Sequence, residues 1–152
     1  MSIEISSYDP KYKEAFKELN LAWIRRFFAV EDKDVEQLEN PERILEQGGE
    51  IVFALFGGDA VGTCAVINEG NGVFELAKMA VDPDFQGQGI AHGLMKAAEK
   101  FVRERGGKKI YLVSNQSLAP AITLYKKHGY IVTSLTQNPE YSRGNIEMEK
   151  LF

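Results

Sequence analysis

The chain has 152 residues, of which 44% are apolar, and its formal net charge is −4. This size predicts a single domain over residues 1–152 with a normal buried core, and the acidic balance argues against nucleic acid as a partner, because a general nucleic-acid binder presents a basic face. No stretch of about 18 apolar residues is present, and no basic segment precedes an apolar one at the N-terminus, so we expect neither a membrane span nor a signal peptide.

Cysteine and histidine content narrows the chemistry. Cys64 is the single cysteine, which excludes a disulfide within the chain and suits a reducing, cytoplasmic location. It stands in the strand-like stretch G-T-C-A-V-I, so we expect a buried core residue rather than a reactive thiol. His92 and His128 are the two histidines and lie far apart in the sequence. Without a cluster of Cys or His, no metal site is expected.

The N-terminal third shows signals for one short strand and three helices. Residues 2–6 alternate and predict an edge strand. Asp9 followed by Pro10 is typical of a helix start, and apolar residues at helical spacing then predict a long helix with Trp23 and Phe27 in the core. Two shorter helices are expected over residues 31–39 and 41–47.

From residue 51 the pattern changes to strands separated by glycine-rich turns. Turn signals at 57–59 and 70–72 predict an antiparallel meander of three strands. A helix is then expected from about Ile90 to Gly106, and a second one over 118–128. The expected strands cover residues 51–56, 60–68, 73–81, 108–115, 130–135 and 145–152.

The most informative segment is residues 81–92, V-D-P-D-F-Q-G-Q-G-I-A-H, which leads directly into a predicted helix. Backbone N–H groups at a helix N-terminus, left uncovered by side chains at Gly87 and Gly89, form an anion site suited to a phosphate. A P-loop would need Lys and Ser or Thr after the last glycine, and a dinucleotide fingerprint would need a third glycine where His92 stands. The spacing of Gln86, Gly89 and Ala91 fits the pattern Q/R-x-x-G-x-G/A instead.

A second motif follows at residues 114–130, S-N-Q-S-L-A-P-A-I-T-L-Y-K-K-H-G-Y. With both motifs in this order, the chain resembles the GNAT superfamily of acyl-CoA-dependent N-acetyltransferases over roughly residues 50–152. The resemblance implies an α/β fold: a mixed, mostly antiparallel seven-stranded sheet flanked by helices, in the order β-α-α-α-β-β-β-α-β-α-β-β.

The resemblance also implies acetyl-CoA as co-substrate. Strands 73–81 and 108–115 would splay apart beside a bulge, and the pantetheine arm would lie between them like a short extra strand. The loop before the helix would hold the pyrophosphate. The residues expected at the cofactor are Met79, Ala80, Val81, Gln86, Gly87, Gln88, Gly89, Ile90, Ala91, His92, Asn115, Tyr125 and Lys127.

Two residues are candidates for proton transfer. Tyr125 matches the family's general-acid tyrosine and would protonate the departing thiolate. Glu75 is the candidate general base. It lies six residues before Val81, the same offset as the glutamate base has in the histone-acetylating branch of the family. A chain of water molecules could accept the proton instead. Lys78 is unusual inside a strand and would pair with Glu75 or bind an acidic group of the substrate. Strand parity places Glu75 and Lys78 on opposite faces unless a bulge intervenes.

The acceptor amine is less well defined by the sequence. Phe28, Glu31, Tyr141 and Arg143 stand at element ends or in loops, where binding residues concentrate. Arg143 could bind a carboxylate, which favours an amino-acid-like acceptor. Eight acidic residues between positions 31 and 50, against two basic ones, favour a polyamine or a basic peptide instead.

We therefore expect an N-acetyltransferase that transfers acetyl directly from acetyl-CoA to a primary amine of a small molecule or peptide. The alternatives are a non-catalytic acyl-CoA-binding regulatory module, which would not need Tyr125, or a transferase of another acyl group. A homodimer through the last strands is also conceivable.

Overall fold

The computed structural model describes residues 2–152, which form a seven-stranded sheet in the order β1-β2-β3-β4-β5-β7-β6. Neighbouring strands are antiparallel except for β4 and β5, which run parallel. The strands are β1 (Ile3–Ser7), β2 (Glu50–Phe56), β3 (Asp59–Gly70), β4 (Val73–Val81), β5 (Lys109–Ser114), β6 (Ile131–Ser134) and β7 (Ile146–Leu151). The predicted mixed, mostly antiparallel sheet is confirmed.

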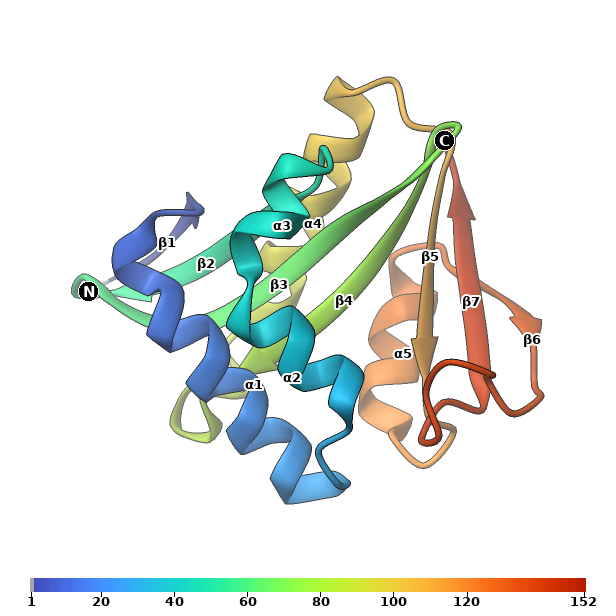
Figure 1. Ribbon diagram of the computed structural model, residues 1–152, viewed down its shortest axis with the longest axis horizontal. Helices are drawn as coiled ribbons and strands as arrows, with labels where there is room; N and C mark the ends of the chain where they lie inside the picture. Colours follow the sequence, from blue (N-terminus) through green and yellow to red (C-terminus); the bar gives the residue numbers. More distant parts are fainter. Residues whose placement is uncertain (1) are drawn as a thin grey trace.

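Helices cover both faces of the sheet (Figure 1). The first group, α1 to α3, packs on one face, and α4 with α5 packs on the other, so each face has its own apolar core. The α-helices are α1 (Lys13–Phe27), α2 (Asp32–Glu39), α3 (Pro41–Glu46), α4 (Ile90–Glu104) and α5 (Ala119–Lys127). Short 3₁₀ turns, η1 (Pro10–Tyr12) and η2 (Pro83–Phe85), precede α1 and α4. The predicted helix start at Asp9 is found, but its first turn is the 3₁₀ turn η1. The Asp9 carboxylate caps this turn by accepting from the Lys11 N–H.

The core assignments hold for Cys64, hold in part for Trp23, and fail for Phe27. Cys64 is fully buried between the sheet and α4. Phe27 is 44% exposed, whereas Trp23 is half-buried, packs against the core under α1 and also lines a cavity. Helical spacing identifies the inward side of α1 correctly, but the helix extends beyond the sheet it covers, so its last turn leaves Phe27 in solvent.

A β-bulge interrupts β4 opposite Cys64. Thr63 pairs with Ala80 and Ala65 pairs with Ala77, so two residues of β4, Lys78 and Met79, lie opposite one residue of β3. Lys78 has a φ of +53°, an uncommon conformation for a residue with a side chain. The bulge shifts the alternation by one residue. Strand parity alone is therefore wrong here, and Glu75 and Lys78 line the same cavity.

The parallel pair β4 and β5 separates along its length. Hydrogen-bonded pairing is confined to Val73–Glu75 of β4 and Lys109–Tyr111 of β5. Beyond Glu75 the two strands diverge, while β5 continues to pair with β7 over all of its residues. The predicted splaying is confirmed, and it opens the sheet at the point where the bulge lies. Within residues 2–152, none of the helices is both long and apolar enough to cross a membrane.

Candidate active site

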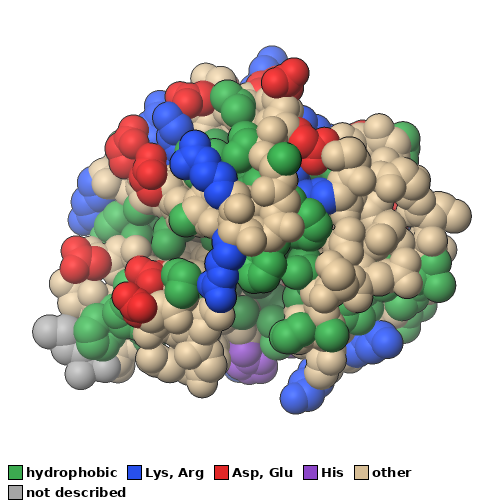
Figure 2. Space-filling view, turned by 90° about the horizontal axis from the view of Figure 1, so that it is seen from below, with side chains coloured by type: hydrophobic (Ala, Val, Ile, Leu, Met, Phe, Trp, Pro, Cys, Tyr) green, Lys and Arg blue, Asp and Glu red, His purple; other side chains and the backbone are tan. Residues whose placement is uncertain are grey.

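A cavity fills the opening between the diverging strands. Seen from below Figure 1, apolar side chains gather around a hollow near the middle of the molecule, with a histidine at its edge (Figure 2). Residues of α1, β4, β5, α5 and the loop before β7 line the cavity. The predicted site residues that it brings together are Phe28, Glu75, Met79, Asn115, Tyr125, Tyr141 and Arg143.

Glu75 is the acidic group of this cavity. It is 4% exposed, and among residues 2–152 no side chain or backbone group forms an ion pair or hydrogen bond with its carboxylate. Burial raises the pKa of Glu75 to about 7, because the charged form loses its hydration. A group with this pKa can gain and release a proton near neutral pH, which a general base requires.

Lys78 pairs with Asp34 and not with Glu75. Its Nζ lies 2.5 Å from Oδ1 of Asp34, on α2, and both side chains are almost completely buried. Arg143 binds the same carboxylate with both arms of its guanidinium, at 2.8 Å and 2.7 Å. Burial alone would raise the pKa of Asp34, but the hydrogen bonds from Arg143 and Lys78 outweigh burial and hold the pKa of this carboxyl well below its usual range.

This ion-pair network changes how two of the predicted acceptor residues are to be understood. Nη1 of Arg143 also lies 2.9 Å from Oε2 of Glu31, so its guanidinium is already paired with two carboxylates. Glu31 caps α2, accepts from the Ser142 N–H, and does not line the cavity. The expectation that Arg143 offers a free guanidinium to a substrate carboxylate is therefore not supported. Asp34 was missed because its partners lie 44 and 109 positions away in the sequence.

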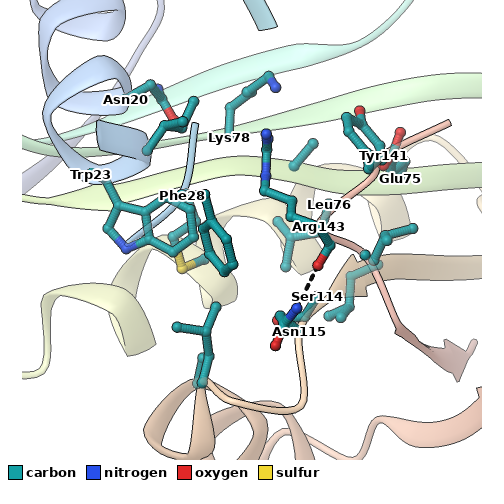
Figure 3. Close-up of a pocket in the computed structure, with 18 of the residues that line it drawn as sticks. Asn20, Trp23, Phe28, Glu75, Leu76, Lys78, Ser114, Asn115, Tyr141 and Arg143 are labelled. Carbon is teal, nitrogen blue, oxygen red and sulfur yellow. Dashed lines mark hydrogen bonds between the residues drawn. The ribbon is translucent and has the colours of Figure 1, made fainter. Parts of the chain in front are cut away.

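The loop before β7 is ordered by its own hydrogen bonds. The Asn138 side chain accepts from the Glu140 and Tyr141 N–H groups, and the Gln137 amide donates to three loop carbonyls. This ordering places Tyr141 in the cavity wall, where its side chain is buried while its hydroxyl has no partner among residues 2–152. Figure 3 shows Tyr141 beside Glu75, on the side of the cavity opposite Trp23 and Phe28.

Tyr125 reaches the cavity from α5, on the other face of the sheet. Burial raises the pKa of Tyr125 to about 12, so its phenol is protonated at neutral pH and can donate. Asn115 also lines the cavity, but its amide donates to the Arg143 carbonyl at 2.7 Å and accepts from the Ser117 N–H at 2.9 Å. The side chain of Asn115 therefore positions the loop before β7 (Figure 3).

The glycine-rich loop leaves the N-terminus of α4 open. Gly87 and Gly89 both have a φ of +78°, and a Cβ added to either would meet no described atom within 4 Å. Within the described chain no side chain caps α4, so the N–H groups of its first turn are free to bind an anion. The loop is anchored where Phe85 packs on Phe56 of β2, with ring centroids 5.3 Å apart.

The remaining cofactor candidates lie around this loop. Gln86 and Gln88 are exposed beside the two glycines, and Ile90 is buried under the first turn of α4, so only its backbone is available to a ligand. His92, in the same turn, has its Nδ1 2.8 Å from Nε2 of His128, at the end of α5. Lys127, which directly precedes His128, is exposed in the last turn of α5. Ala80 and Val81 end β4 beside the bulge, and Ala91 follows Ile90.

Comparison with known proteins places this geometry in a family. The sequence model described as the acetyltransferase (GNAT) family matches residues 13–130. The chain belongs to this family. The match includes the glycine-rich loop, the bulged strand and the helix that carries Tyr125.

Named relatives and solved structures agree. The chain is 33% identical to mycothiol acetyltransferase of Saccharomonospora viridis over 76 residues, which cover 50% of the chain and 24% of that protein. It thus spans about a quarter of that relative, and about two fifths of streptothricin acetyltransferase of Streptomyces lavendulae and of N-acetyltransferase 8 of Rattus norvegicus. A GNAT-family acetyltransferase from Staphylococcus aureus Mu50 superposes with a TM-score of 0.89 at 24% identity, covering 99% of both chains. PaiA N-acetyltransferase from Thermoplasma acidophilum, solved with coenzyme A, superposes with a TM-score of 0.77 at 19% identity, covering 100% of both chains.

The burial of Glu75 makes the stability of the fold depend on pH. Its folded pKa of about 7 lies above its ordinary value of 4.5, so the folded protein binds this proton more tightly than the unfolded chain. The free energy of unfolding therefore falls by roughly 3 kcal/mol as the pH rises from the unfolded pKa through the folded pKa. We expect Glu75→Gln to remove this loss. Urea denaturation should then show that the free energy of unfolding of the variant, relative to that of wild type, increases between pH 4 and pH 8. Parallel pH profiles would contradict the assignment.

Removing the Asp34 carboxylate should destabilise the fold strongly. Asp34→Ala leaves Lys78 and Arg143 buried without their shared partner, which typically costs about 3–5 kcal/mol. Glu36→Ala is the control, because Glu36 lies on the same helix and makes an exposed ion pair with Arg43, worth about 1 kcal/mol or less. Urea denaturation of both variants measures the difference, and equal effects would show that the buried network contributes little.

Proposed function

We propose that the chain transfers acetyl from acetyl-CoA to a primary amine of a small molecule or peptide. The observation that carries the proposal is the cavity between the splayed strands, which places an unpaired acid and a protonated tyrosine in one space. Family membership supports acetyl transfer. Solved structures of the same fold contain coenzyme A and acetyl-CoA.

The proposed cofactor site uses the backbone exposed by the splay. Past Glu75, β4 has no pairing with β5, so its N–H and C=O groups are available to the amides of a pantetheine arm. The free N–H groups from Gly87 to His92 suit the pyrophosphate. Lys127 would add positive charge near the phosphates of the nucleotide end.

The proposed reaction needs three proton transfers. Glu75 accepts a proton from the acceptor ammonium, and the freed amine nitrogen attacks the thioester carbonyl carbon. Backbone N–H groups of Met79 to Val81 would stabilise the resulting oxyanion. The C–S bond then breaks as Tyr125 gives its proton to the leaving thiolate, and the Tyr125 phenolate takes the second proton from the acylated nitrogen, so the products are the N-acetylated amine and free coenzyme A.

The cofactor site is tested by blocking the phosphate loop. Gly89→Trp places a bulky side chain in the open space at the α4 N-terminus, so acetyl-CoA and free coenzyme A should both lose measurable binding in isothermal titration. Gly106→Trp is the matched control, since Gly106 also has a positive φ and open space around it but lies beyond the far end of α4. Absence of acetyl-CoA binding to folded wild type would overturn the proposal.

The role of Tyr125 is tested by removing its hydroxyl. Tyr125→Phe should lower kcat by about 100-fold, in the range of a lost general acid, with KM for acetyl-CoA unchanged because the ring is retained. Tyr12→Phe is the control, as Tyr12 packs on Phe53 in the α1 core, away from the cavity. A variant with wild-type kcat would instead leave protonation of the thiolate to solvent.

A further inference from the structure

The cations lining the cavity already have anionic partners. Lys78 is bound to Asp34, and Arg143 is bound to Asp34 and Glu31. The two basic and two acidic side chains of this network cancel in charge. In the described part of the chain, the cavity therefore offers no unpaired basic side chain to a carboxylate of the acceptor. The acidic residues of the network are equally unavailable to a polyamine.

Besides the Tyr125 and Ser114 hydroxyls, the free polar groups of the cavity include Glu75, its one acidic side chain among the described residues, and the Tyr141 hydroxyl. Tyr141 is 7% exposed, and its hydroxyl has no partner among residues 2–152. Glu75 likewise has no partner in that range, and Figure 3 places it beside Tyr141. A buried acid next to an unsatisfied phenol oxygen is complementary to an ammonium group, which has three donors and a positive charge.

The opposite side of the cavity is mostly aromatic and apolar, with the Asn20 amide as its polar member. Trp23 and Phe28 lie with ring centroids 6.0 Å apart at an angle of 44°, and Ile24 and Leu118 continue this wall. A second ammonium against this wall would lose its hydration with no acid to replace it. A flat apolar group would instead bury its surface there.

Building on the proposed function, we propose that the acceptor is an arylalkylamine: one ammonium, an apolar aromatic body, and no carboxylate beside the amine. A carboxylate would place a second negative charge near Glu75 with no free cation to balance it. The same cavity should thus reject α-amino acids and disfavour polyamines. The expected preference for an arylalkylamine depends on which charged side chains of the cavity wall are already paired. It does not depend on the net negative charge of the chain.

The experiment compares acceptors that differ only in the carboxylate. Phenethylamine, tyramine and tryptamine are each assayed against phenylalanine, tyrosine and tryptophan, with putrescine and spermidine as polyamines, by thiol release from acetyl-CoA. We expect kcat/KM for each arylalkylamine to exceed that of its amino acid by about 100-fold or more, since like-charge contacts in a desolvated site are strongly unfavourable. The polyamines should rank below the arylalkylamines.

Two variants separate specificity from general damage. Glu75→Gln should lower the ratio of kcat/KM for each arylalkylamine to kcat/KM for its amino acid, because it removes the charge that repels the carboxylate. The variant should also slow both reactions. Phe28→Ala should raise KM for phenethylamine. Phe27→Ala is the matched control, as Phe27 is the preceding residue and is 44% exposed outside the cavity.

The outcomes distinguish this inference from the proposed function. Preferred acetylation of an amino acid or a polyamine, or acetyl-CoA binding with no member of the panel acetylated, would overturn the arylalkylamine assignment and leave the cofactor site standing. Failure of acetyl-CoA to bind at all would overturn both. If this kcat/KM ratio were unchanged in Glu75→Gln, Glu75 would not be the residue that excludes the amino acids.

Discussion

The acceptor side of the cavity depends on one buried carboxylate. Asp34 is 0% exposed and binds Lys78 at the β4 bulge, Arg143 in the loop before β7, and the Glu31 N–H at the start of its own helix. Three segments that are distant in sequence are thus joined at one side chain. Because a buried charge is tolerated only when it is paired, these segments are stable only in this arrangement.

The same carboxylate determines the chemistry around it. By binding Lys78 and Arg143, Asp34 keeps two nearby cations from pairing with Glu75. Glu75 is left with burial as the main influence on its acidity, and burial raises its pKa to about 7. If Lys78 formed a direct ion pair with Glu75, the attraction would favour the charged form and lower this pKa. A structural ion pair therefore creates the conditions for a general base next to it.

Sequence reasoning predicted those parts of the fold whose signals are local. Glycine turns at 57–59 and 70–72 separate the meander strands, and the loop before α4 was located from its own residues. The splay of β4 from β5 followed from the family resemblance and is seen in the three-residue pairing. The assignment of Phe27 to the core was wrong, since a helical pattern gives a side of the helix but not where the sheet beneath it ends.

The partner of Lys78 was not predictable, because two non-local features decide it together. The bulge reverses the alternation of β4, and only then does the Lys78 side chain point to the face where α2 supplies Asp34. The positive φ of Lys78 is unfavourable by itself, and strained backbone persists where surrounding contacts fix it. The ion pair with Asp34 supplies such a contact. The interaction that neutralises Lys78 thus also stabilises the bulge, and the bulge lies where β4 leaves β5 and exposes its backbone to the cavity.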